Sequence, residues 1–92
     1  MAIQETDCSL KDLPDWKVNS NGELEKQFTF TGFPQSILFV NSVALLAESK
    51  NHHPDITIQW NKVRFALTTH DSGGLTAKDF ELGKLISSLP VL

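Results

Sequence analysis

The pattern of hydrophobic and polar positions predicts two β-hairpins, each followed by a helix. In the first hairpin, apolar and polar residues alternate over 16–18 and again over 24–30, with Asn19-Ser20-Asn21-Gly22 between them. Such alternation is typical of half-buried strands, and an Asn-Gly pair is a strong turn signal. Ahead of the hairpin, residues 9–13 predict one short capped helical turn. Residues 1–8 show no period, and we expect them to be flexible.

A long helix is predicted between the hairpins, over residues 35–50. Pro34 suits its first turn, Asn51 can end it in a left-handed conformation, and Pro54 prevents it from resuming. Its apolar positions form a wide stripe, as expected of a helix that packs on a sheet. These positions are Ile37, Leu38, Val40, Val43, Ala44, Leu45 and Ala47.

The second hairpin is predicted from alternation on both sides of Asn61-Lys62, which we take as a two-residue turn. This register places Trp60 opposite Val63, and its extension places His53 opposite His70. Side chains that face each other directly have Cβ atoms roughly 5 Å apart. The hairpin therefore predicts that His53 and His70 converge.

A final helix completes the fold, because Thr76 and Asp79 have the spacing of a capping box. Its expected core face is formed by Phe80, Leu82, Leu85, Ile86 and Leu89. The element order α-β-β-α-β-β-α predicts an α+β fold, a single domain over 1–92 with a four-stranded antiparallel sheet and three helices packed on one face. The other face would be bare, so we expect a homodimer or homotetramer.

Composition excludes several classes of function. The 8 basic residues are spread along the chain and are outnumbered by 11 acidic ones, which argues against binding nucleic acid. Cys8 is the only cysteine, so we expect no disulfide or thiolate metal cluster, and a reducing compartment is favoured. The apolar stretch over 37–47 is shorter than the ~20 residues that span a bilayer, and the acidic first residues do not resemble a signal peptide. We expect a cytoplasmic protein without a membrane partner.

The chemistry of the chain is concentrated in its histidines, all of which lie between His52 and His70. Histidine changes charge near neutral pH, so the cluster favours a proton-transfer or metal site. Glu48 precedes His52 by about one helical turn, and a carboxylate beside an imidazole stabilises and orients the imidazolium. We interpret this pair as a candidate proton donor with its orienting partner.

Plainer roles for the same residues stay open at this point. His52 alone could be a helix C-cap, Asp79 alone a capping residue, and His70 a surface residue at a strand end. Three histidines could also hold zinc. Adjacent ligands such as His52 and His53 are awkward for a metal, because neighbouring side chains in an extended chain diverge.

The spacing of these residues resembles the pterin-4a-carbinolamine dehydratase family. The pattern in this chain is Glu48, three residues, His52-His53-Pro54, five residues, Trp60, nine residues, His70, eight residues and Asp79. The likeness covers about residues 9–90 and also includes Trp16, Asn61-Lys62-Val63, Thr69-His70 and Gly74-Leu75-Thr76.

The resemblance implies an enzyme, a hydro-lyase that removes water from 4a-hydroxytetrahydropterin to give quinonoid dihydropterin. This reaction supports tetrahydrobiopterin recycling, and the family needs no metal or organic cofactor. By resemblance, His52 and His70 are the acid/base pair, and His53 chiefly binds and orients the pterin substrate.

Supporting roles also follow from the resemblance. Glu48 would tune His52, and Asp79 would steady the site from the last helix. Trp16 and Trp60 would wall or support the pocket, although core packing is the favoured role of Trp60.

A binding role without catalysis is the alternative within the same family. Some members are dimerisation cofactors of a homeodomain transcription factor, and degenerate members assist Rubisco assembly. The degenerate branch loses active-site histidines, whereas this chain keeps all three. The resemblance therefore favours the enzyme.

Overall fold

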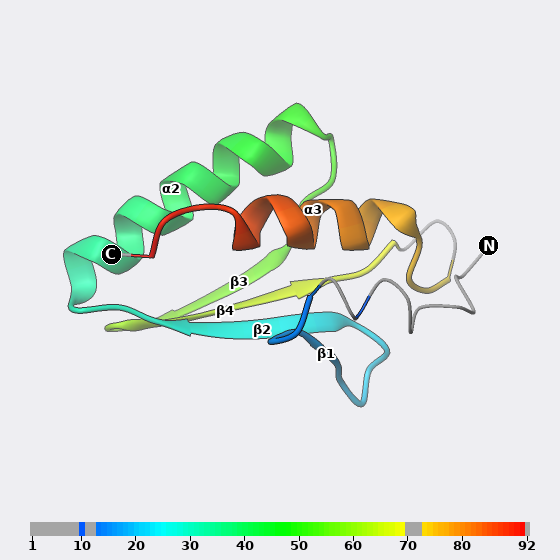
Figure 1. Ribbon diagram of the computed structural model, residues 1–92, viewed down its shortest axis with the longest axis horizontal. Helices are drawn as coiled ribbons and strands as arrows, with labels where there is room; N and C mark the ends of the chain where they lie inside the picture. The colour runs from blue at the N-terminus through cyan, green and yellow to red at the C-terminus, as the bar shows by residue number, and fades with distance from the viewer. Residues whose placement is uncertain (1–9, 11–12, 70–72, 92) are drawn as a thin grey trace.

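The computed structural model describes residues 10, 13–69 and 73–91. Within them lie a four-stranded sheet and two helices, in the order β1 (Lys17–Val18), β2 (Leu24–Thr29), α2 (Phe33–Ser49), β3 (Asp55–Gln59), β4 (Lys62–Leu67) and α3 (Ala77–Ser87) (Figure 1). The strands are all antiparallel and lie side by side in the order β1-β2-β4-β3. The predicted α+β class and antiparallel sheet are confirmed.

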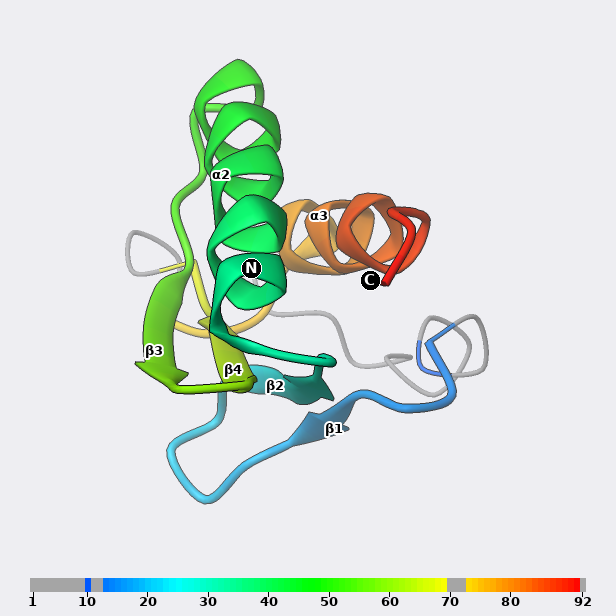
Figure 2. The same cartoon turned by 90° about the vertical axis from the view of Figure 1, so that its left-hand side faces the viewer.

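The third predicted helix, over 9–13, lies mostly outside the described residues, as do residues 1–8. Of that short segment the structure describes Leu10 and Leu13, which are joined by a turn hydrogen bond of 2.9 Å from the Leu13 N–H to the Leu10 carbonyl. Leu13 is 1% exposed and belongs to the core. The two described helices cover the same face of the sheet, as predicted (Figures 1 and 2).

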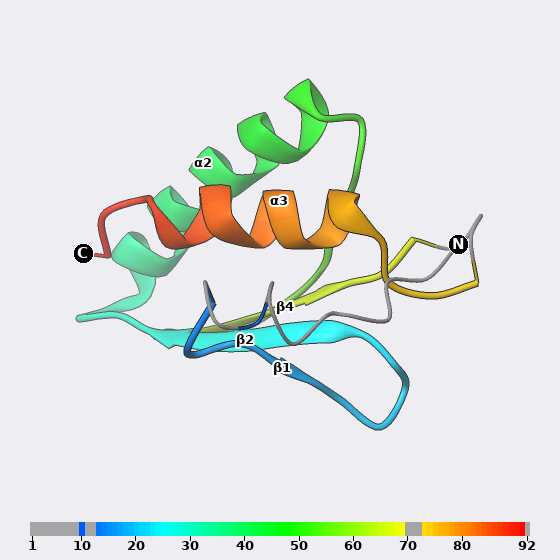
Figure 3. The same ribbon diagram turned by 45° about the vertical axis from the view of Figure 1, so that its right-hand side comes forward.

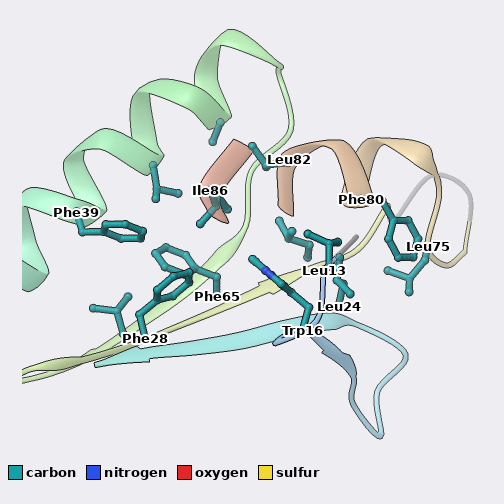
Figure 4. Packing of buried hydrophobic residues seen from close by; sticks show 14 of the residues in the cluster. Leu13, Trp16, Leu24, Phe28, Phe39, Phe65, Leu75, Phe80, Leu82 and Ile86 are labelled. Carbon is teal, nitrogen blue, oxygen red and sulfur yellow. The ribbon is translucent and has the colours of Figure 1, made fainter. Parts of the chain in front are cut away.

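The core fills the space between this sheet face and the two helices. On the covered face, Leu24 lies opposite Leu67 and Phe28 lies opposite Val63, and all four side chains are buried. Figure 4 shows the aromatic rings that pack there, with Phe28 4.9 Å from Phe39 between ring centroids. The apolar positions of the alternating pattern in β2 and β4 therefore face the helices.

The uncovered face of the sheet is polar. Gln27, Arg64 and Thr57 are neighbours across three strands, and the Arg64 Nε atom lies 3.1 Å from a Glu25 carboxylate oxygen. Water can therefore solvate this face, and its lack of a helical cover does not by itself require a second subunit.

The register of the second hairpin differs from the prediction by two residues. Gln59 pairs with Lys62, so the turn consists of Trp60 and Asn61 rather than Asn61 and Lys62. Ile56 consequently lies opposite Phe65. A shift of two residues keeps every side chain on its predicted face, because side chains alternate with a period of two.

Contacts with other elements hold the turn in this register. The Phe30 N–H donates to the Asn61 carbonyl at 2.7 Å, and the buried Ser36 hydroxyl donates to the Trp60 carbonyl at 2.9 Å. Trp60 has a φ of 54° and is 67% exposed. The expectation that Trp60 packs in the core is therefore wrong.

The long helix is confirmed, with Pro34 in its first turn, but its buried stripe is narrower than predicted. The buried positions are Ser36, Phe39, Val43 and Ala47. Leu38 and Leu45 from the predicted stripe are 55% and 75% exposed. Neither described helix is long and apolar enough to cross a membrane.

Candidate active site

The end of α2 positions two histidines through its last backbone hydrogen bonds. Asn51 adopts the predicted left-handed conformation, with φ at 50°. Its N–H donates to the Glu48 carbonyl at 3.1 Å, and the His52 N–H donates to the Ala47 carbonyl at 3.0 Å. This pair of bonds is the Schellman motif that ends many helices. It fixes His52 as the first residue beyond the reversal of the chain.

His52 contacts Asp79 of α3. Its Nε2 atom lies 2.6 Å from Oδ1 of Asp79, with side-chain exposures of 11% and 0%. Figures 1 and 3 show that the C-terminal end of α2, the N-terminal end of α3 and the end of β4 lie toward the same end of the molecule. Two residues separated by 27 positions in sequence thus form one largely enclosed pair, in which Asp79 is fully buried.

Glu48, which we expected to orient His52, contacts His53 instead. The His53 Nε2 atom lies 3.0 Å from Oε1 of Glu48, and these side chains are 59% and 80% exposed. The prediction assumed that the helix continues through His52. Because Asn51 reverses the chain, adjacent side chains diverge, and the second histidine points back toward the last helical turn.

Asp79 is held by its own helix and by the segment after β4. It is the N3 residue of the predicted capping box, and its Oδ2 atom accepts the Thr76 N–H at 2.9 Å. The same oxygen accepts the Thr69 hydroxyl at 2.7 Å. A buried carboxylate needs such partners, since an unpaired buried charge is costly. Thr69 was not predicted as a site residue, because no local pattern links it to the capping box.

His70 lies outside the described residues. The chain before and after it is joined by an antiparallel bridge between Thr69 and Gly74. The predicted convergence of His70 with His53 came from a register that the structure contradicts, so that argument is lost. Its predicted acid/base role does not depend on that argument and stays a prediction.

Trp16, predicted to wall or support the pocket, is 5% exposed and lies in the core (Figure 4). Its indole N–H donates to the Ser87 hydroxyl at 2.8 Å, and its ring packs in a T-shaped arrangement with Phe28, with 6.5 Å between the ring centroids. These contacts give Trp16 a structural role between the first hairpin and α3.

The His52–Asp79 geometry allows one nitrogen of His52 to work on a substrate. A carboxylate in its ionised form only accepts hydrogen bonds, and such a partner would place the hydrogen of this contact on Nε2 of His52. A neutral ring then has its lone pair on Nδ1, where it can take up a proton. Among residues 10, 13–69 and 73–91, no group of three or more His, Cys, Asp or Glu side chains is placed to hold a metal ion.

Comparison with known proteins identifies the family of this chain. The family model described as pterin 4 alpha carbinolamine dehydratase matches residues 1–89. A Chloroflexus aggregans protein, named as an inferred pterin-4-alpha-carbinolamine dehydratase, is 51% identical over 80 residues, covering 87% of this chain and 85% of the relative. A Thermosynechococcus vestitus protein with the same name is 49% identical over 86 residues, covering 94% and 90%.

Solved structures show the same fold. A transcriptional coactivator/pterin dehydratase from Brucella melitensis superposes with a TM-score of 0.88 at 27% identity, covering 96% of this chain and 95% of the other. A pterin dehydratase-like RuBisCO assembly factor of the alpha-carboxysome gives a TM-score of 0.65 at 20% identity, covering 83% and 93%, and supports the fold alone. The chain belongs to the pterin-4a-carbinolamine dehydratase family, a family of lyases that act in tetrahydrobiopterin recycling.

Proposed function

We propose that the protein dehydrates 4a-hydroxytetrahydropterin to quinonoid dihydropterin, with histidines as the general acid and base. The observation that carries this proposal is the 2.6 Å contact between His52 and the fully buried Asp79. A histidine held rigidly by a carboxylate, with one ring nitrogen still available, is suited to proton transfer.

The reaction needs one proton donor and one proton acceptor. The C4a–O bond breaks and its oxygen leaves as water, which requires a proton on the departing hydroxyl. The N5–H bond also breaks, and its electron pair forms the new C4a=N5 double bond. General acid and base catalysis each contribute typically ~10²–10⁴-fold. We assign these two tasks to His52 and His70 without deciding between them, and His53 binds and orients the pterin.

The carboxylates take separate supporting roles in this proposal. Asp79 positions His52, because it contacts that ring and is itself buried. Glu48 positions His53 at the surface. Trp16 acts indirectly, by holding the first hairpin against α3. No metal or organic cofactor takes part.

A dehydratase assay tests the assignment. The purified protein should accelerate the decay of 4a-hydroxytetrahydropterin, and His52→Ala or His70→Ala should each lose most of that acceleration. A double variant with full activity would contradict the proposal. Stoichiometric zinc in the active protein, measured by elemental analysis, would instead support the metal alternative.

A cytoplasmic homodimer or homotetramer is part of the same proposal. Leu38 and Leu45 lie two helical turns apart on α2 and are exposed. Beside Leu38, a cavity of about 250 Å³ is lined by Leu38, Phe39, Ser42, Leu89 and Pro90. Analytical ultracentrifugation should find an oligomer that Leu38→Ser with Leu45→Ser dissociates, whereas a monomeric wild type would refute this part. The single cysteine fits the reducing cytoplasm.

A further inference from the structure

We propose that the hydroxyls of Thr69 and Thr76 are positioning groups for His52. They form a directed chain of hydrogen bonds that holds Asp79 so that His52 carries its hydrogen on Nε2 and presents the lone pair of Nδ1. The catalytic consequence rests on the proposed dehydratase function, but the tautomer of His52 can be measured without it.

The direction of each bond follows from counting hydrogens. Thr69 has one hydroxyl hydrogen, and it donates this hydrogen to Oδ2 of Asp79 at 2.7 Å. The Thr69 oxygen also lies 2.8 Å from the Thr76 hydroxyl, so the Thr76 hydroxyl must be the donor of that bond. The Thr76 oxygen in turn accepts the Lys78 N–H at 3.3 Å. The chain therefore runs from the first turn of α3 to the carboxylate in one direction.

The two donors on Oδ2 determine what Oδ1 can do. Oδ2 receives the Thr69 hydroxyl and the Thr76 N–H, which come from two different segments, so the carboxylate cannot rotate without losing both bonds. Oδ1 is then left to accept from His52 Nε2 at 2.6 Å. Fixing the hydrogen on Nε2 in a neutral ring leaves Nδ1 without one.

Burial makes the Thr69 hydroxyl hard to replace by water. Asp79 is 0% exposed and Thr69 is 8% exposed. A buried carboxylate that loses a donor is left partly unsatisfied, and rotation of its plane is the simplest relief. Such rotation would move Oδ1 away from His52.

The first measurement is the tautomer of His52 in the wild-type protein. Nitrogen-15 NMR of the histidine rings at alkaline pH, where a histidine ring is neutral, distinguishes a hydrogen on Nε2 from one on Nδ1. We expect the Nε2–H form for His52. A hydrogen on Nδ1 would overturn the proposal, whatever the enzymatic activity.

The second measurement compares variants at Thr69. Thr69→Val removes the hydroxyl while keeping the shape, and Thr69→Ser restores the hydroxyl. We expect Thr69→Val to give mixed tautomers of His52 and to lower kcat about 10-fold to 100-fold, since small misplacements of catalytic groups cost this much. KM should change less than about 2-fold, because Thr69 does not touch the substrate in this proposal. Thr69→Ser should recover the wild-type tautomer and most of kcat.

Thr57→Val is the matched control, since Thr57 is an exposed threonine in the middle of β3. It should leave tautomer, kcat and KM unchanged. If Thr69→Val does not fold, Thr69→Ala takes its place, because it removes the same hydroxyl with a smaller side chain. A hydroxyl-free variant with a wild-type tautomer and kcat would overturn the proposal. The expected tautomers in a protein without dehydratase activity would support the positioning role and refute only the proposed function.

Discussion

The two adjacent histidines of this protein each face a carboxylate, but in different surroundings. The His52–Asp79 pair is 11% and 0% exposed and joins two helices. The His53–Glu48 pair is 59% and 80% exposed and spans one helix end. The same two functional groups therefore form a rigid unit between two helix ends in one place and a solvated contact at the end of a single helix in the other.

The physical reason is the number of constraints on each carboxylate. Asp79 accepts hydrogen bonds from His52, Thr69 and Thr76, and no water is needed to satisfy it. Glu48 has one described side-chain contact, and at this exposure water and salt compete with it. We therefore expect Asp79 to matter for both catalysis and stability, and Glu48 for neither to a large extent.

Replacing each carboxylate by its amide should give the largest difference in kcat between the two pairs. Asp79→Asn keeps the shape of the side chain but replaces one of the two accepting oxygens with an NH₂ group. Either His52 or Thr69 then faces a donor instead of an acceptor. We expect kcat to fall about 100-fold or more, as when a positioned histidine takes the wrong tautomer. Glu48→Gln should change kcat less than about threefold. Equal losses in the two variants, with both folded by circular dichroism, would refute the distinction.

Double-mutant cycles should show the same contrast in stability. Alanine replacements at His52 and Asp79 should give a coupling free energy of about 1.5–3 kcal/mol, the range for hydrogen bonds to charged groups. The corresponding cycle at His53 and Glu48 should give under about 0.5 kcal/mol. Urea denaturation measures both.

A high salt concentration should increase the difference between the two coupling free energies. At an ionic strength of about 1 M the Debye length is only ~3 Å, so the exposed coupling should vanish while the buried one persists. A buried coupling that disappears with salt would mean that water reaches Asp79.

Both pairs depend on the end of α2, because the reversal of the chain at Asn51 sets the directions of His52 and His53. Asn51→Ala must hold a left-handed backbone, which costs about 1 kcal/mol for a residue with a Cβ atom and no local hydrogen bond. Asn51→Gly should change the unfolding free energy by less than about 0.5 kcal/mol, because glycine adopts this conformation freely. Thermal or urea unfolding of the two variants gives the difference. Equal stabilities would show that the reversal does not depend on this residue.

Glu25 is a third carboxylate, outside both pairs. Its replacement should have the smallest effect on the free energy of unfolding. The hydrogen bond from Asn19, together with the nearby Arg64 guanidinium, holds the pKa of Glu25 below its ordinary value despite an opposing effect of burial. A pKa lowered in the folded state contributes stability above the unfolded pKa and loses it as the pH falls through the folded pKa.

Glu25→Gln should therefore be less stable than wild type at neutral pH, by less than about 1 kcal/mol. The difference should close as the pH falls through the acid range in which Glu25 is protonated. Urea denaturation along a pH series measures it. A difference that grows toward acid pH would contradict the sign of the shift.

The elements that depend on local residues were predicted correctly. Pro34 and Asn51 delimit α2, and Thr76 with Asp79 caps α3, because each signal acts within one or two turns of the chain. Alternation also placed the right residues on the covered face of the sheet, even where the register was wrong.

The features that depend on distant contacts were not predicted. The turn at Trp60-Asn61 is set by bonds to Phe30 and Ser36, more than twenty positions away. The exposure of Leu38 and Leu45 depends on where α3 packs, which the period of one helix cannot show. The same holds for Thr69, which reaches Asp79 only through the folded chain.

Local sequence was enough to indicate the family, the two described helices and the strands, and it nominated the histidines and carboxylates as candidate site residues, because spacing and local capping depend only on neighbouring positions in the chain. Which carboxylate each histidine faces depends on the folded arrangement of the chain. Pairing depends on the direction in which Asn51 turns the backbone and on which helix end lies opposite. Glu48 and Asp79 are chemically alike, so residue type could not choose between them. Their burial distinguishes them, because Asp79 is fully enclosed beside His52 whereas Glu48 is exposed to water.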